Sequence, residues 1–99
     1  MRFLPLLLLL AIQPAQSRPW AEEKCLRYRE AWAGAVQLRG TAGLSAEFLA
    51  AHDAFLASGC RERAACPRNP SDIAMADLMA VAGVNAGISG TFLPFRCNP

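Results

Sequence analysis

Apolar side chains recur at a helical spacing along three stretches of the chain, and no stretch shows the two-residue alternation of a strand. The first stretch runs from about Trp20 to Arg39, and Gly40 and Gly43 follow it as helix breakers. Its apolar stripe consists of Cys25, Tyr28, Trp32, Ala35 and Val36. This pattern predicts an amphipathic helix that buries one face.

The second stretch is short and carries a row of small side chains. Ser45 is a good N-cap and Gly59 is a good terminator, so we expect a helix between them. The small residues are spaced by four and form one ridge of that helix: Ala46, Ala50, Ala54 and Ser58. Because this ridge is nearly flat, we expect a neighbouring helix to approach closely along it.

The third stretch is apolar almost all round. Ser71 is its expected cap, and residues 73–88 contain two strongly polar residues, Asp77 and Asn85. A helix of this kind is either the central element of a core or a membrane segment. Sixteen residues span roughly 24 Å, which is short of a bilayer. We therefore expect a buried central helix and keep a membrane-active helix as the alternative.

The end of the chain places three large apolar side chains around a proline. Phe92, Leu93 and Phe95 flank Pro94, which opposes both helix and internal strand. We expect an extended tail that lies over the helices, although its aromatics could instead contact a partner or a membrane. The predicted fold is therefore all-α: a small three-helix bundle, stabilised by disulfides, with an extended C-terminal tail.

The beginning of the chain has the features of a signal peptide. Arg2 precedes ten apolar residues at positions 3–12, and the small residues Ala15 and Ser17 suit signal peptidase. A membrane span needs roughly 20 apolar residues, twice as many as this run. We expect residues 1–17 to be removed, which leaves 18–99 as a single helical domain in the periplasm or outside the cell.

Four cysteines follow the predicted cleavage site, and in an exported chain they are expected to form two disulfides. Cys25 and Cys60 are almost equidistant from the turn between the first two helices, and an extended tail could bring Cys97 back to Cys66. We therefore favour Cys25–Cys60 with Cys66–Cys97. The runner-up pairing, Cys25–Cys66 with Cys60–Cys97, is nearly as easy, because three of the cysteines share one end of the bundle.

His52, the only histidine, is the first candidate for chemistry. It shares a helix face with Phe48 and Phe55, whereas the adjacent Asp53 points about 100° away. Cys60 is roughly 12 Å further along the axis and is expected to be oxidised, so a Cys–His dyad is not predicted. We expect a partly buried imidazole bonded to a backbone carbonyl or to a polar group of another helix. A pH-sensitive contact and a metal ligand are the alternatives.

Asp77 and Asn85 are the polar exceptions on the third helix and lie on broadly the same side of it. A buried carboxylate needs hydrogen bonds or a positive partner. An arginine of the first helix could supply these (Arg27, Arg29 or Arg39). We expect a structural contact that sets the helix register, with ligand binding as the alternative.

The remaining patterns exclude more than they suggest. The chain lacks the closely paired ligands of zinc sites and the C-x-x-C of redox motifs, so no metal or cofactor is predicted. Ten basic residues less Arg2 leave nine against eight acidic, a net charge of +1, which does not indicate nucleic-acid binding. The basic loop Arg61–Arg68 could meet lipid headgroups or an acidic partner, but a solvated loop is the simpler interpretation.

The sequence thus predicts a small exported binding or accessory protein that is not an enzyme and that acts through a surface on an unknown partner, which could be a protein. A membrane-active or toxin-like helical peptide is the alternative function. A metal-binding or enzymatic disulfide scaffold is weaker, because no nucleophile, acid–base pair or ligand set is evident.

Overall fold

The structure, a computed structural model, describes residues 18–98, and the predicted signal peptide lies outside them. Residues 18–98 form three α-helices: α2 (Trp20–Arg39), α3 (Ala46–Ala57) and α4 (Pro70–Asn85). A short 3₁₀ helix, η1 (Gly90–Phe92), follows them. The described residues contain no strand, and the predicted all-α three-helix fold is confirmed.

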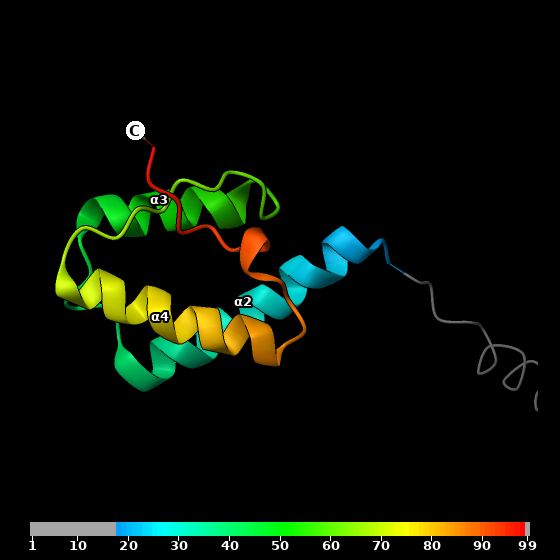
Figure 1. Cartoon of the computed structure of the whole chain (residues 1–99), viewed down its shortest axis with the longest axis horizontal. Helices are drawn as coiled ribbons and strands as arrows, with labels where there is room; N and C mark the ends of the chain where they lie inside the picture. The colour runs from blue at the N-terminus through cyan, green and yellow to red at the C-terminus, as the bar shows by residue number, and fades with distance from the viewer. Residues whose placement is uncertain (1–17, 99) are drawn as a thin grey trace, which may run out of the picture.

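The helices form a bundle in which α2 opposes the direction of the other two (Figure 1). Arg27, near the start of α2, contacts Ala86 at the end of α4, and Arg39 at the end of α2 contacts Ala74. The chain returns alongside α3 after residue 60 before it enters α4. The tail lies against this returning segment, because the amide of Ala65 donates to the carbonyl of Pro94.

The first turn of α3 has the predicted cap, whereas that of α4 does not. The hydroxyl of Ser45 accepts a hydrogen bond from the amide of Phe48, as a capping serine does. The cap of α4 is Asn69 and not Ser71, since the Asn69 side chain accepts from the amide of Asp72. Pro70 is suited to the first helical position, where no amide hydrogen is needed, so the helix begins before the predicted serine.

Glycines in the left-handed conformation end α3 and α4. Gly59 has a φ of 73° and Gly87 a φ of 81°. Beyond them, the amide of Cys60 donates to Phe55 and that of Ile88 to Gly83, so both helices end in a Schellman motif. The glycine at position 87 thus ends α4 at Asn85, and Ile88 does not extend the helix as the apolar pattern suggests.

The core lies between α2, α3 and the inner face of α4. Its fully buried side chains include Tyr28, Phe48, Phe55, Met75 and Met79. Tyr28 and Phe55 meet edge to face with ring centroids 5.1 Å apart, a favourable arrangement for aromatic rings.

Two disulfides close the described chain. One joins Cys25 of α2 to Cys60 at the end of α3, and the other joins Cys66 to Cys97 of the tail. This is the pairing that the helix hairpin and the returning tail favour. The first bond closes a loop of 35 residues and the second a loop of 31. Loops of this length are long enough for each bond to stabilise the fold by about 3–4 kcal/mol.

The tail is extended and packed, as predicted, apart from the single turn of η1. Phe92, Leu93 and Pro94 are buried, and Phe95 stacks on Phe48 with centroids 5.8 Å apart. The aromatics of the tail therefore complete the core over α3.

The prediction that α4 is a buried central helix is wrong for one of its faces. Ile73, Val81 and Val84 are 52%, 60% and 65% exposed. The predicted close packing along the small ridge of α3 is also wrong over its first half, because Ala46 and Ala50 are exposed. Within residues 18–98, no helix has the length and apolar character needed to cross a membrane.

Candidate functional site

His52 lies in the centre of the aromatic core. Its ring is fully buried and stacks on Trp32 of α2 with centroids 3.7 Å apart. The Nε2 atom forms a 2.6 Å hydrogen bond with the hydroxyl of Tyr28, also from α2. His52 thus joins α3 to α2 through a side chain, and its burial is more complete than the sequence predicts.

The surroundings of His52 favour the neutral imidazole. Burial lowers its pKa from 6.5 to about 4, because the charged ring would lose its hydration. The Nδ1 atom is buried and has no hydrogen-bond partner among the described residues. Burial also raises the pKa of Tyr28 above its usual range, so the phenol stays protonated. A ring enclosed in this way cannot reach a substrate in solution.

Asp72 is a buried polar residue that the sequence analysis missed. Its carboxylate accepts hydrogen bonds from the amide and hydroxyl of Ser45, at 2.8 and 2.7 Å, and from the amide of Arg68 at 2.8 Å. Burial alone would raise the pKa of this carboxyl, but the hydrogen bonds from Ser45, Arg68 and Asn69 outweigh it, and the pKa lies below 3.8. Asp72 therefore holds the starts of α3 and α4 together.

A signal for this contact is present in the sequence. Asn69 and Asp72 have the spacing of a capping box, in which the third helical residue turns back toward the residues before the helix. Placing the cap at Ser71 hid this spacing.

Asp77 and Asn85 do not make the buried contacts expected of them, because both are exposed on α4. The arginines of α2 bond to backbone carbonyls of the other helices instead. Arg27 donates to Ala86 at 3.1 Å, and Arg29 donates to Leu56. Both carbonyls lie at helix C-termini, where cations are favoured.

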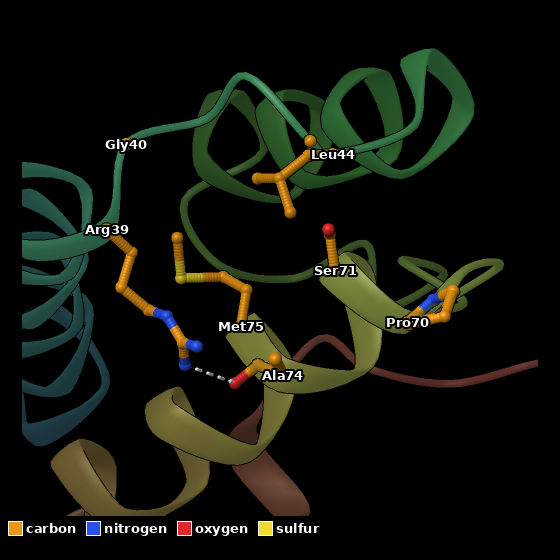
Figure 2. A pocket seen from close by; sticks show the side chains of 8 residues that line it. Arg39, Gly40, Leu44, Pro70, Ser71, Ala74 and Met75 are labelled. Carbon is orange, nitrogen blue, oxygen red and sulfur yellow. Dashed lines mark hydrogen bonds between the residues drawn. The ribbon is translucent and has the colours of Figure 1, made fainter.

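Arg39 makes the third of these contacts, at the edge of a cleft of about 320 Å³. Figure 2 shows its guanidinium reaching the carbonyl of Ala74, 3.4 Å away, with Leu44 and Met75 pointing into the same cleft. Arg39 is the one charged residue of this lining, and its contact with α4 is already made. The cleft therefore offers little to orient a polar ligand.

The exposed side of α4 forms a distinct surface, which we call the α4 apolar face: Ile73, Asp77, Ala80, Val81 and Val84. All five residues are exposed and fall on one side of the helix. Asp77 is its only charged residue and lies near its middle. Isolated exposed aliphatic residues are ordinary, whereas this helix face carries several together.

A second cleft, of about 520 Å³, lies beside the Cys25–Cys60 disulfide. Its walls come from the first half of α2, the turn after α3 and Phe92. Arg63 of the loop after α3 is half-buried here. The expectation of a fully solvated loop is therefore wrong at this residue.

Residues 18–98 contain no group of three histidine, cysteine or acidic side chains placed to hold a metal ion. All four cysteines are in disulfides, and none is available as a thiolate ligand or nucleophile.

Comparison of the chain with protein families, with curated proteins and with solved structures found no match.

Proposed function

We propose that this chain is an exported, non-catalytic binding protein that docks a partner protein through the α4 apolar face. The observation that carries the proposal is the exposure of Ile73, Val81 and Val84 on a helix whose opposite side is buried in the core. Burying the exposed part of such a side chain against a partner contributes about 1–2 kcal/mol, since a third to a half of each is already covered. Three of them supply a hydrophobic centre for a small interface.

Asp77 favours a protein partner over a membrane. It lies among the exposed aliphatic residues, so the face cannot enter hydrocarbon without its carboxylate. Burial of an unpaired carboxylate is strongly unfavourable. A protein can place a lysine or arginine opposite Asp77, and the partner we propose carries such a residue at the centre of its apolar surface.

The same carboxylate opposes a second copy of this chain as the occupant. A two-fold dimer is self-complementary, so packing two α4 helices across Asp77 would bring the two carboxylates together. Like charges in direct contact are unfavourable, and no basic residue of the α4 apolar face could balance them.

Export is supported by the apolar run at positions 3–12 and by the two disulfides. Disulfides persist in oxidising compartments such as the periplasm or the extracellular space. The proposed mature protein begins at Arg18, and the intact mass of the secreted protein would establish this. A non-catalytic role is supported by the burial of the only histidine and by the oxidation of all the cysteines.

Site-directed photo-crosslinking in the exporting cell tests the docking. A photoreactive phenylalanine at Val81 should crosslink one protein, whereas the same group at the exposed Glu47 of α3 should not. Adding Asp77→Lys to the chain with the photoreactive group at Val81 should abolish the crosslink, because this lysine would then face the basic residue proposed for the partner. A crosslink that survives this charge reversal, or no crosslink at Val81, refutes the proposal.

A membrane-active peptide is the second candidate, since the same exposed valines could contact lipid. Co-sedimentation with phosphatidylcholine vesicles that Val81→Asp abolishes would favour it over the protein partner. Native mass spectrometry tests a second copy of the chain as the occupant. A dimer that Val81→Asp dissociates would assign the face to that second copy.

A further inference from the structure

The cleft beside the Cys25–Cys60 disulfide carries an excess of positive charge. Four basic residues line it, Lys24, Arg29, Arg61 and Arg63, against one acidic residue, Glu22. The salt bridges within residues 18–98 both use Glu23, which pairs with Arg18 and Arg27. The carboxylates of the described chain thus leave the four cations of the cleft without a partner in an ion pair.

Two of these cations are held in place by an aromatic ring. The ammonium of Lys24 lies 4.8 Å from the centroid of Phe92, and the guanidinium of Arg63 lies 5.6 Å from it. Both distances are within the range of a cation–π interaction. Phe92 is itself buried, so the two charges lie beside apolar surface. Each contact favours the position of its side chain over the ring.

Arg63 also has unused hydrogen-bonding capacity. Its Nε atom is buried and has no hydrogen-bond partner among the described residues. A guanidinium offers a planar fork of donors that matches the oxygens of a phosphate or carboxylate. An anion in the cleft would meet the two terminal nitrogens of this guanidinium together with Lys24, because Nε itself is enclosed.

The remainder of the lining is apolar apart from Ser58, whose hydroxyl is already bonded to the backbone. Leu26, Pro19 and the disulfide form part of the walls, and the volume of about 520 Å³ is within the range of small-molecule sites. Two other clefts differ in charge. The one in Figure 2 has Arg39 alone, and a shallow one beside α4 is lined by one acidic and one basic residue, Asp77 and Arg96, which form no ion pair.

We propose that this cleft binds an amphipathic anion, with its phosphate or carboxylate group between Lys24 and Arg63 and its apolar part against Leu26 and Phe92. The anion is either a soluble molecule or the headgroup of an anionic lipid, since both present the same chemistry. This site is separate from the α4 apolar face and does not depend on the function proposed for it.

Titration of the isotope-labelled mature protein with monomeric octyl phosphate tests the proposal. Saturable amide shifts are expected around residues 59–61, with weaker binding of inorganic phosphate and none of the neutral octyl glucoside. Arg63→Gln and Lys24→Gln should each weaken octyl phosphate binding about tenfold, because each removes a charged donor. Arg68→Gln is the matched control, an exposed arginine outside the lining, and should leave the affinity unchanged.

If Arg63→Gln disturbs the packing on Phe92, the affinity of the Lys24→Gln variant for octyl phosphate tests the site instead.

Vesicles of phosphatidylglycerol and phosphatidylcholine separate the two sources of the anion. Binding to phosphatidylglycerol alone that Arg63→Gln abolishes and Val81→Asp leaves intact assigns a lipid headgroup. Binding of octyl phosphate without vesicle binding assigns a soluble anion. Amide shifts with octyl glucoside equal to those with octyl phosphate overturn the proposal. So does a protein that binds neither octyl phosphate nor phosphatidylglycerol vesicles.

Discussion

The burial of side chains in α3 and α4 is the reverse of what the compositions of the two helices suggest. α3 places its histidine at the centre of the core, whereas α4, the more uniformly apolar helix, leaves Ile73, Val81 and Val84 in solvent. The difference lies in the neighbours of each helix. Around α3, Trp32 and Tyr28 of α2 and Phe95 of the tail cover the ring of His52. α4 is covered by the rest of the fold on one side, the side of Met75 and Met79.

This comparison shows that a polar side chain can be buried when hydrogen bonds or a neutral protonation state offset its lost hydration. His52 is tolerated because it is neutral, stacked and bonded to Tyr28 through Nε2. Asp72, the buried polar residue of α4, is tolerated because four donors or capping groups surround it. Exposed valines need no compensation within the monomer, and their exposure is therefore the feature that points outward to a partner.

The largest effect is expected from a charge on the covered side of α4. Met79→Asp would bury an unpaired carboxylate where Met79 is fully enclosed, and we expect a loss of at least about 4 kcal/mol. Circular dichroism should show little helix. A folded Met79→Asp protein would mean that this side of α4 is open, and the contrast with α3 would fail.

The second effect is a pH dependence that comes from His52. Its pKa is about 4 in the folded chain and 6.5 without burial, so folding favours the neutral ring. Its contribution is therefore complete above pH 6.5 and is lost as the pH falls from 6.5 through 4. At about 1.4 kcal/mol for each pH unit, the loss approaches about 3 kcal/mol.

Urea unfolding across this pH window measures the dependence. His52→Gln should flatten the slope, because glutamine carries no titrating proton. An unchanged slope in this variant would show that His52 is not the group responsible and that its burial is unimportant for acid stability.

A smaller loss, of about 2 kcal/mol, is expected from Asp72→Ala at neutral pH, because the donors of Ser45 and Arg68 would lose a charged acceptor. The lowered pKa of Asp72 means that its contribution is present above the usual range of an aspartate and is lost below pH 3.8. Asp77→Ala is the matched control on the exposed side of α4. Equal urea midpoints for the two variants would contradict the buried role of Asp72.

The smallest effect belongs to the α4 apolar face. Val81→Asp should change stability by less than about 0.5 kcal/mol, because this side chain is 60% exposed and its removal opens no cavity. The unfolding midpoint should stay near that of the unchanged protein, while the Val81→Asp protein no longer binds the partner that the photoreactive group at Val81 identifies. A strongly destabilised Val81→Asp protein would restore the prediction of a buried central helix.

Features that depend on near neighbours in the chain could be predicted from the sequence. The bounds of α2 follow from its apolar period and from Gly40, and the start and end of α3 follow from Ser45 and Gly59. The expected disulfide pairing follows from helix lengths, since two helices of known length place their cysteines at a common end. The cap of α4 was misplaced because Asn69, Pro70 and Ser71 are all suited to a helix start, and only their hydrogen bonds separate them.

Helix type and helix ends are local properties, because their hydrogen bonds span at most five residues, and so the residues themselves are sufficient to specify them. Which face of a helix is covered is not local. The burial of His52 depends on Trp32 and Phe95, which are 20 and 43 positions away in the chain, and the exposure of Val81 depends on where α2 and the tail come to rest. Burial of an apolar side chain is favourable wherever it occurs. The tertiary arrangement decides which apolar side chains are covered within the chain and which stay exposed for a partner.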